Sequence, residues 1–422
     1  MTAGTRLKSE IGQATADMKR RKLLFITSQL PYPPFGGGTS TSWNFIRFLS
    51  EHFDTSMATI LKWDDPKNEA AFRARVKLDR YFSLELNVER TAGTVARSYL
   101  KGVPINLLRN YHPELKRIIH QWLEAGGFDF VFVDHYEMFQ YVPDGLEVRA
   151  VLHEHNAEFV MWERYASAST SPLKKLVTRL ESKRIFQVEK RFCERADLVL
   201  ANPNDQEVLT ALTSGKSRIE KIIPCGEDFM LDWPDLQWSA TEESLLYVGS
   251  LGWEANVDGL LWFLEEGWPT LKARKPEVRF YIVGGKPDPR IVSAAEGLED
   301  VVLTGFVDDL ETYYSKCRVF LTPLRFGSGV KLKVMNAMFR GIPVVTTAIG
   351  AEGMNVESGT HLLCGDTMSE SVDNAVILLE DQTTWTRLRD HSRSLTAADF
   401  SWKTQLENIK AHILSLEGPG AL

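Results

Sequence analysis

The sequence of residues 319–346 is VFLTPLRFGSGVKLKVMNAMFRGIPVVT, which we interpret as two short strands joined by a glycine-broken loop and a helix. The predicted strands cover residues 319–322 and 343–346, and Gly341 with Pro343 ends the helix between them. Similar short apolar runs alternate with longer helical stretches along the whole chain. This alternation is the pattern of a parallel sheet covered by helices on both faces, so we predict an α/β fold.

The remaining strand candidates fall into two sets, one in each half of the chain. They are Lys22–Ser28, Phe128–Val133, Val148–His153 and Leu198–Ala201, followed by Ser244–Gly249, Val278–Val283 and Val301–Thr304. Between the sets, Glu227–Thr241 is rich in Asp, Trp and Pro and reads as a linker. A chain of 422 residues is also too long for one ordinary core. We therefore predict two doubly wound domains with a boundary near residue 225.

The opening stretch lies within a positively charged segment. Residues 312–351 contain no Asp or Glu, although the formal net charge of the chain is −7. The cations of this segment are Lys316, Arg318, Arg325, Lys331, Lys333 and Arg340. A helix N-terminus carries a partial positive charge, so two lysines at the start of the predicted helix favour a bound phosphate or carboxylate. The alternative is a solvated basic face.

Polar residues also follow the predicted strands of the N-terminal half. Gly36–Gly38 come after the first strand and would let backbone amides approach a ligand, although a tight connection explains them equally well. His153 and His155 share one face of a strand, and Asp134 follows the strand before it. Ligands bind beyond the carboxyl ends of strands in open α/β sheets, so we expect these groups at one cleft. The histidine pair lacks an evident third ligand, so we predict no metal, and a structural histidine at a strand end is the alternative role for either residue.

Composition narrows the class of protein further. The mild acidity argues against general nucleic-acid binding, and no apolar run is long enough to cross a bilayer. The polar residues 1–21 do not resemble a signal peptide, so we expect a flexible N-terminus and a cytoplasmic protein. The cysteines have no paired spacing, and we expect buried reduced thiols at Cys193, Cys225, Cys317 and Cys364.

The segment 172–195 is a candidate membrane-contacting helix. It holds eight Lys or Arg residues against three Glu residues. A basic amphipathic helix can lie against the anionic inner face of a membrane, which would make the protein a peripheral one. The alternative is an ordinary solvated helix.

The C-terminal half, from Leu246 to Met354, resembles the GT-B glycosyltransferases of family 4, also called glycosyltransferase group 1. The matching blocks are Tyr247–Ser250 with Trp253 and Asn256, Val283–Gly285, Thr304–Asp308, Pro323–Lys333, Gly341–Thr347 and Gly350–Gly353. The N-terminal half adds Pro31–Pro34 before the three glycines, and His155–Glu158. The blocks occur in the expected order over almost the whole chain.

The resemblance implies two Rossmann-like domains that face a central cleft. Residues 1–21 would be a flexible N-terminus, 22–225 the acceptor-side domain, 226–396 the donor-binding domain and 397–422 a C-terminal helix that crosses back to the N-terminal domain. The implied activity is retaining, metal-independent transfer of a hexosyl or related group from a nucleoside-diphosphate sugar to a glycan or glycolipid acceptor, without a cofactor. The implied process is cell-surface polysaccharide biosynthesis.

The resemblance also implies roles for particular residues. Catalytic roles fall on His155, Lys331 and Lys333, and donor contacts on Gly37, Gly38, Gly305, Val307, Arg325, Gly327, Ser328, Gly329, Asn336 and Glu352. Arg325 and the two lysines would surround the diphosphate, and Gly37 and Gly38 would close over it. His155 would lie near the donor sugar, and the backbone of Val307 would contact the base.

The chain departs from the family pattern at the donor site. Many members have two glutamates where this chain has Ser328 and Asn336, and an Arg and Lys phosphate pair is missing in the stretch that holds Ser250 and Asn256. Diphosphate binding would then depend mainly on the two lysines of the predicted helix. These departures favour one alternative, a catalytically impaired binding or scaffold subunit. A second alternative is a nucleotide-sugar epimerase with the same two Rossmann-like domains.

Overall fold

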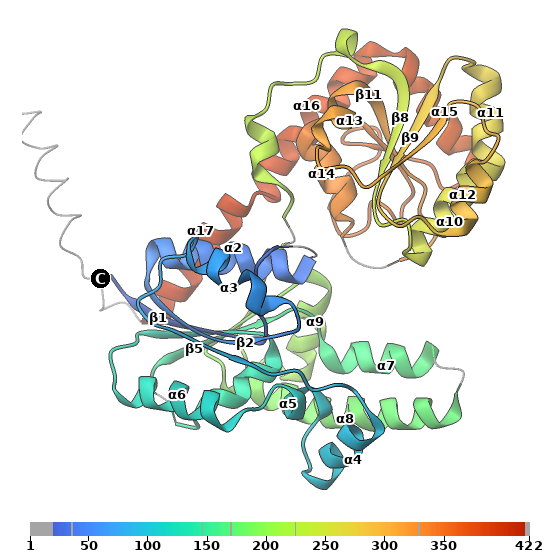
Figure 1. Cartoon of the computed structure of the whole chain (residues 1–422). Helices are drawn as coiled ribbons and strands as arrows, with labels where there is room; N and C mark the ends of the chain where they lie inside the picture. The colour runs from blue at the N-terminus through green and yellow to red at the C-terminus, as the bar shows by residue number, and fades with distance from the viewer. Residues whose placement is uncertain are drawn as a thin grey trace, which may run out of the picture. The chain divides into compact units, whose positions relative to one another are not determined.

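The computed structural model describes residues 20–34, 37–145, 147–168, 171–223, 225–327 and 330–417. The chain forms two compact units (Figure 1). Unit 1 is Met1–Ile222 with Asn408–Leu422, and unit 2 is Ile223–Glu407. Each unit is described by itself below, and the cleft expected between the domains stays a prediction.

Unit 1 is built on sheet A, a seven-stranded parallel sheet with the order β3-β2-β1-β4-β5-β6-β7. Its strands are β1 (Lys22–Thr27), β2 (Asp54–Leu61), β3 (Tyr81–Glu85), β4 (Phe130–Asp134), β5 (Arg149–Glu154), β6 (Leu198–Ala201) and β7 (Ile219–Lys221). The strand order reverses between β1 and β4, which is where open sheets of this kind bind ligands. In register, Thr27 pairs with Asp134 and Asp134 pairs with His153, so these three residues lie side by side at the carboxyl edge.

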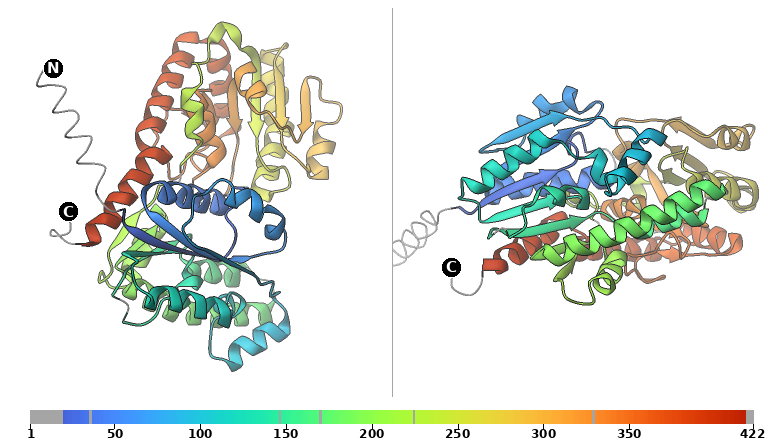
Figure 2. Two further views of the ribbon diagram at one scale, coloured as in Figure 1. Left: turned by 60° about the vertical axis from the view of Figure 1, so that its left-hand side comes forward. Right: turned by 90° about the horizontal axis from the view of Figure 1, so that it is seen from below.

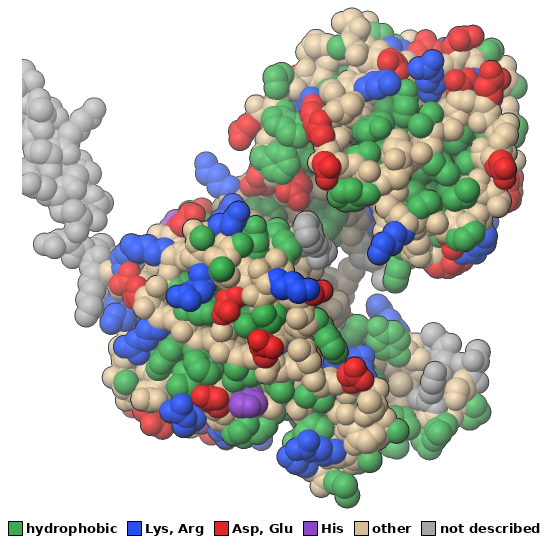
Figure 3. All heavy atoms as spheres, in the orientation of Figure 1, with side chains coloured by type: hydrophobic (Ala, Val, Ile, Leu, Met, Phe, Trp, Pro, Cys, Tyr) green, Lys and Arg blue, Asp and Glu red, His purple; other side chains and the backbone are tan. Residues whose placement is uncertain are grey.

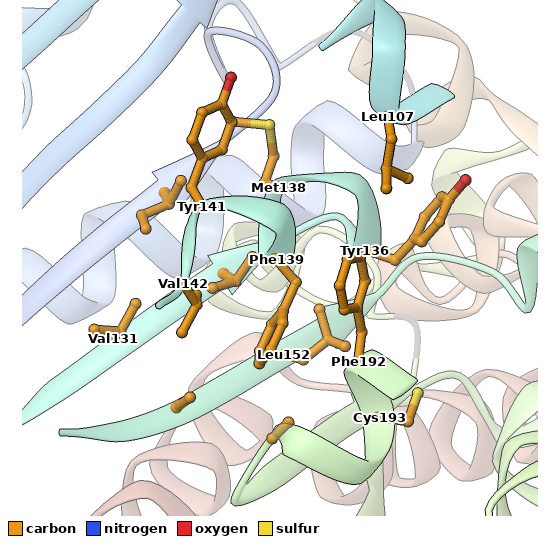
Figure 4. Close-up of a cluster of buried hydrophobic side chains, with 14 of the residues drawn as sticks. Leu107, Val131, Tyr136, Met138, Phe139, Tyr141, Val142, Leu152, Phe192 and Cys193 are labelled. Atoms are coloured by element: carbon orange, nitrogen blue, oxygen red, sulfur yellow. The ribbon is translucent and has the colours of Figure 1, made fainter. Parts of the chain in front are cut away.

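Helices cover both faces of sheet A (Figure 1, Figure 2). They are α2 (Gly37–His52), α3 (Asp65–Arg73), α4 (Ala92–Leu100), α5 (Ile105–Arg109), α6 (Pro113–Glu124), α7 (Glu158–Ala168), α8 (Pro172–Arg195) and α9 (Pro203–Leu212), with a 3-10 helix η1 (Tyr136–Tyr141). On one face, buried side chains of η1 pack with Leu152 of β5 and with Phe192 and Cys193 of α8 (Figure 4). This core fixes the carboxyl ends of β4 and β5, which carry Asp134 and His155.

Unit 2 is built on sheet B, a six-stranded parallel sheet with the order β10-β9-β8-β11-β12-β13. Its strands are β8 (Glu242–Val248), β9 (Arg279–Val283), β10 (Val301–Gly305), β11 (Cys317–Thr322), β12 (Val344–Thr346) and β13 (Leu363–Cys364). Counted along the unit, this is the same order as in the first six strands of sheet A. The predicted α/β fold with two Rossmann-like parallel-sheet domains is therefore confirmed.

The helices of unit 2 pack into a separate core on each face of sheet B. They are α10 (Glu254–Trp262), the π-helical turn η4 (Phe263–Gly267), α11 (Trp268–Arg274), α12 (Pro289–Ala295), α13 (Glu311–Lys316), α14 (Leu332–Arg340), α15 (Met368–Glu380) and α16 (Gln382–Asp399). The chain continues with α17 (Trp402–Leu414), which starts in unit 2 and ends in unit 1, and with the 3-10 turn η5 (Ser415–Glu417). The predicted helix end at Gly341 is confirmed, because this glycine adopts the left-handed conformation with φ 81° that closes many helices.

The segment interpreted as a linker is packed onto unit 2. It forms the 3-10 helices η2 (Asp228–Asp232) and η3 (Trp238–Ala240), and Met230 and Leu236 are buried. Arg393 of α16 donates hydrogen bonds to backbone carbonyls of this segment, including that of Leu231 at 2.8 Å. These bonds hold the segment against α16.

Two further expectations concern the cysteines and the membrane. All four cysteines are free, and Cys193, Cys225 and Cys317 are buried as predicted, whereas Cys364 is only half-buried. Over the described ranges of the chain, no helix has the length and apolar character that a membrane span requires.

Candidate active site

The predicted site residues lie mostly where the chain leaves the carboxyl edges of the two sheets. In unit 2, Gly305 ends β10 and Val307 follows it, and Arg325 and Gly327 follow β11. Lys331 lies immediately before α14, Lys333 and Asn336 belong to α14, and Glu352 follows β12. In unit 1, Gly37 and Gly38 begin α2 after β1, and His155 follows β5. Ser328 and Gly329 lie outside the described residues.

Lys333 reaches from the first turn of α14 to the carboxyl end of β8. Its Nζ donates a hydrogen bond to the hydroxyl of Tyr247 at 3.0 Å and another to the side-chain oxygen of Asn256. The amide of Asn256 in turn donates to the carbonyl of Ser250 at 2.8 Å. A Cβ added at Gly249 would lie 3.3 Å from Nζ, so this glycine leaves space for the ammonium group. The three contacts place Lys333 at the centre of the edge.

The charge of Lys333 has no acidic partner in the described part of the chain. Its two hydrogen-bond partners, Tyr247 and Asn256, are both uncharged. Burial, and then the neighbouring charge of Lys331, lowers the pKa of Lys333 to about 7. A buried ammonium group without a carboxylate is unfavourable, and a bound anion would remove that penalty. The site is therefore prepared for a negatively charged ligand.

Lys331 lies immediately before α14 and, unlike Lys333, has an acidic partner. Its Nζ is 3.4 Å from a carboxylate oxygen of Glu352, and its side chain is 10% exposed. A Cβ added at Gly327 would lie 3.5 Å from Cε of the lysine. The structure thus brings Lys331, Glu352 and Gly327 together, as three of the predicted donor-binding residues.

The other cations of the acid-free segment have protein partners. Arg325 forms two hydrogen bonds with Asp258, at 2.8 and 2.5 Å, and Arg340 is buried and bonded to Glu311. Arg318 is buried, donates to the backbone carbonyl of Thr241 and stacks on an indole ring. Lys316 pairs with an acid at 3.7 Å. The anion-binding prediction for this segment therefore concentrates on Lys331 and Lys333.

The remaining predicted donor contacts of unit 2 include Asn336, Gly305 and Val307. The side-chain oxygen of Asn336 accepts a hydrogen bond from the backbone N–H of Glu227 at 3.2 Å. Gly305 has φ 72° at a register shift at the end of β10. Val307 is partly buried against the core of unit 2. Their predicted donor contacts stay predictions.

In unit 1, a single buried carboxylate organises the carboxyl edge of sheet A. One oxygen of Asp134 accepts hydrogen bonds from Nδ1 of His153 and Nε2 of His155, both at 2.8 Å, and the other accepts from the hydroxyl of Thr27 at 2.9 Å. Burial alone would raise the pKa of Asp134, but His135 and His155 and the imidazole hydrogen bonds hold it well below its usual range. Asp134 is therefore an anion that accepts from every neighbour.

His155 is held as a neutral imidazole, and its Nδ1 has no hydrogen-bond donor among the described residues. Burial, followed by the proximity of His135 and His153, lowers the pKa of His155 to about 3. Because Asp134 is an acceptor only, Nε2 of His155 carries the proton and Nδ1 keeps its lone pair. Nδ1 faces α2, where a Cβ added at Gly38 would lie 3.5 Å away. The structure thus brings His155 and Gly38 together, and the imidazole can accept a hydrogen bond from a ligand hydroxyl.

The same network contains the atoms of a conceivable metal site. One ligand atom each from Asp134, His153 and His155 lies within 4.8 Å of the others, and no other group of three is found among the described residues. Asp134, on the strand adjacent to the histidine pair, supplies the third ligand atom that the sequence did not make evident. The two hydrogen bonds already account for these atoms, and the absence of a metal stays a prediction.

Three functional partners were missed by sequence reasoning. Asp134 was placed at a strand end but not paired with His155, and the signal was its position on the strand next to β5. Tyr247 and Asn256 were noted only within the family blocks, although both contact Lys333. No local pattern reveals such contacts, because these residues are far from Lys333 in the sequence.

Comparisons with known proteins agree with this architecture. Residues 242–381 match the family model of the Glycosyl transferases group 1. A protein of Klebsiella pneumoniae, described as an uncharacterised 44.6 kDa protein in the cps region, is 23% identical over 353 residues, which cover 81% of this chain and 87% of that protein.

Solved structures with low sequence identity share the fold over almost the whole chain. Sucrose-phosphate synthase from Thermosynechococcus elongatus has a TM-score of 0.62 at 16% identity, covering 94% of this chain and 99% of its own. Anabaena HepE in complex with UDP has a TM-score of 0.63 at 14% identity, and the match covers 93% of this chain and 100% of HepE. A glycosyltransferase from Rickettsia africae has a TM-score of 0.63 at 10% identity, covering 96% and 100%. The protein therefore has the fold of the GT-B glycosyltransferases, and residues 242–381 of its second unit carry the group 1 sequence pattern.

Proposed function

We propose that the protein is a retaining glycosyltransferase of family 4, which moves a hexosyl or related group from a nucleoside-diphosphate sugar to a glycan or glycolipid. The donor binds at the carboxyl edge of sheet B, and unit 1 provides the acceptor side. The reaction uses no metal and no cofactor. The place of the K. pneumoniae relative in a cps region supports a role in cell-surface polysaccharide biosynthesis.

The observation that carries the proposal is the uncompensated charge of Lys333. Every other cation of the acid-free segment has a protein partner. Among the described residues, the hydrogen-bond partners of Lys333 are a phenol and an amide, and neither carries a charge. A diphosphate supplies the missing negative charge, and the N-terminus of α14 adds backbone N–H groups of the same polarity. The structure of HepE with UDP shows that a nucleoside diphosphate binds to one protein of this fold.

The chemistry follows from where negative charge develops. The bond between the anomeric carbon and the diphosphate oxygen breaks, and the acceptor hydroxyl oxygen forms the new bond on the same face of the sugar. The hydroxyl proton passes to the departing phosphate oxygen. Lys331 and Lys333 stabilise the charge that accumulates on this leaving group, which is the role of a divalent ion in other transferases.

His155 positions the donor sugar in this proposal. Its Nδ1 accepts a hydrogen bond from a sugar hydroxyl, because the proton on Nε2 is committed to Asp134. Asp134 acts through the imidazole rather than on the sugar, by fixing its tautomer and orientation.

The proposal is tested by the release of nucleoside diphosphate from a panel of nucleotide sugars. A thermal-shift screen with UDP, GDP, ADP, TDP and CMP first identifies the base, since a ligand of the folded state raises its melting point. Lys331→Ala/Lys333→Ala is expected to lower turnover by about 100-fold or more, as for loss of charge-assisted contacts to a leaving group. Retention is read from the anomeric configuration of the product by NMR.

A matched control lies in the same acid-free segment. Lys316→Ala removes a lysine from the end of α13, just before β11, and therefore at the opposite edge of sheet B. This variant is expected to keep full turnover. Equal losses in Lys316→Ala and in the double variant would contradict the assignment of the two α14 lysines.

The alternative of a binding or scaffold subunit has one supporting observation. The side-chain oxygen of Asn336 is occupied by the backbone of Glu227, at a position where many family members have a ribose-binding glutamate. Binding of a nucleotide sugar without release of nucleoside diphosphate across the whole panel would favour this alternative.

A further inference from the structure

One surface of unit 1 combines exposed apolar side chains with cations. It is formed by α4, by the end of α7 and by the first half of α8, and we call it the α4–α8 surface. Its large apolar residues are Tyr99 and Leu100 of α4, Tyr165 of α7, and Leu173, Leu176 and Leu180 of α8. The exposed fraction is 89% for Leu100 and 70% for Leu173. Figure 3 shows hydrophobic side chains gathered over the α7 and α8 hairpin and basic side chains near the end of α4.

The apolar residues of α8 form one stripe. Leu173, Leu176 and Leu180 follow a spacing of three and four residues, which places them on one side of the helix. Buried residues such as Ile185 lie on a different side, toward the core. The stripe therefore faces away from the core of unit 1. Single exposed leucines are common on protein surfaces, whereas a continuous row of them indicates a binding surface.

The exposed charges of α4 and of the first half of α8 are basic, whereas α7 also exposes Glu163. Residues 90–113 and 164–180 contain no Asp or Glu. The exposed or half-exposed cations near the apolar row are Arg97, Lys101, Arg164, Lys175, Arg179 and Lys183. None of these six cations has an ion pair with a described residue.

The cations in the second half of α8 have acidic partners, so the proposed binding surface is limited to the first half. Arg191 and Arg195 both pair with Asp144, at 3.1 and 3.0 Å, and Lys190 lies 4.0 Å from Glu194. The cations of this half are therefore balanced within the protein. The membrane-contact prediction covered the whole segment 172–195, whereas the cations without an ion pair to a described residue lie in its first half.

Arg184 joins the two parts of the α4–α8 surface. Its guanidinium donates to the hydroxyl and carbonyl of Ser98 at 3.0 and 2.8 Å and lies 4.2 Å from the centre of the Tyr99 ring. Its charge is met by Glu181 at 2.6 Å. Because this residue fixes α4 against α8, the two acid-free segments present one surface rather than two unrelated ones.

We infer that the α4–α8 surface binds the surface of an anionic phospholipid bilayer. Anionic headgroups complement the six unpaired cations, and the leucine row can enter the boundary between headgroups and acyl chains. A nucleic acid would offer the same negative charge but no apolar layer for Leu100 and the leucines of α8. The inference is independent of the proposed transferase activity, since it concerns binding without donor or acceptor.

The test is cosedimentation of the full chain with vesicles of phosphatidylcholine, with and without phosphatidylglycerol. The wild-type protein is expected to sediment with the anionic vesicles, and high salt is expected to reduce this binding. Arg179→Gln/Lys183→Gln is expected to lower the affinity about 30-fold, because each cation near an anionic surface contributes roughly fivefold. Leu173→Ser/Leu176→Ser should weaken the binding that persists at high salt.

The matched control is Lys190→Gln/Arg191→Gln. It removes the same two residue types from the same helix, but from the half that is balanced by acids. This control should bind vesicles like the wild-type protein. Absence of wild-type sedimentation with anionic vesicles would overturn the inference and leave a protein partner as the occupant, and equal losses in the two charge variants would also overturn it. Unchanged circular dichroism of all variants shows that folding is not the cause.

Discussion

Sheet B has the strand order of the first six strands of sheet A, but the side chains at the carboxyl edges of the two sheets differ in charge. The edge of sheet A is lined by side chains, with the carboxylate of Asp134 bonded to two imidazoles and a hydroxyl. The edge of sheet B is lined largely by glycines, including Gly249 and Gly284, and its central side chain is the lysine of α14 that lacks an acid. The Asp134 carboxylate has hydrogen-bond donors within the protein, whereas Lys333 has no acidic partner among the described residues.

This difference shows that two sheets with the same topology can suit two different ligands. A completed network such as that of Asp134 holds a neutral imidazole in one orientation, which suits the positioning of an uncharged sugar. An uncompensated ammonium group near glycine backbone suits a charged ligand that approaches closely. The strand order alone does not predict which edge has which property.

The largest effect is expected from a variant that changes the Asp134 carboxylate at the edge of sheet A. Asp134→Asn removes the negative charge and replaces one carboxylate oxygen by an N–H₂ donor, so the tautomer of His155 is no longer fixed. We expect turnover to fall about 100-fold with the donor KM little changed, as for other residues that orient a functional histidine. Thr27→Val removes only a hydroxyl from the same carboxylate and should cost less than about tenfold. Equal turnover in Asp134→Asn and the wild-type protein would contradict the positioning role.

The glycine lining of sheet B can be tested through stability. A Cβ added at Gly284 would lie 2.0 Å from the carbonyl oxygen of Gly249, whereas one added at Gly285 would have its first neighbour at 3.5 Å. Gly284→Ala should therefore destabilise unit 2 by about 3 kcal/mol, and Gly285→Ala by less than about 0.5 kcal/mol. Urea unfolding of both variants checks this, and similar midpoints would show that the edge is not closely packed.

The neutral imidazole of sheet A predicts sensitivity to acid. An unfolded histidine has a pKa near 6.5, whereas burial and the neighbouring histidines lower the pKa of folded His155 to about 3. The unfolded state binds the extra proton between these values, so stability is lost as the pH falls through this window. The expected loss is about 2 kcal/mol between pH 7 and pH 5. His155→Gln should show a smaller loss when β4 and β5 are followed by pulsed hydrogen exchange during urea unfolding.

The elements that the sequence predicted well are those with continuous apolar runs. The central strands β1, β4, β6, β8 and β11 were found within a few residues of their ends. The strand β2 was not, because Thr55, Ser56 and Thr59 interrupt its apolar pattern although all three are buried. Buried hydroxyls are tolerated when they find carbonyls nearby, as Thr55 does with Leu49 at 3.2 Å. The edge strands β3, β7 and β13 are too short or too exposed to give a clear pattern.

The candidate site was predicted only where a local sequence pattern marks it. Two lysines at a helix start without nearby acids are visible in the sequence, and so is a histidine after a strand. The distinction between Lys333 and Arg325 was not visible, because it depends on Asp258 pairing with the arginine and not with the lysine. Such pairings arise from packing between distant segments, which neither periodicity nor spacing encodes.

The most direct test of the central claim is the proton balance of nucleoside-diphosphate binding. A diphosphate next to Lys333 must raise its pKa from about 7, so the complex takes up a proton above that pH. Calorimetry with UDP, or with the nucleotide selected by the thermal-shift screen, is run at about pH 8.5 in buffers of different ionisation enthalpy. We predict an uptake of close to one proton per bound nucleotide. Binding at this pH without proton uptake would contradict the assignment of Lys333 as the diphosphate-binding cation.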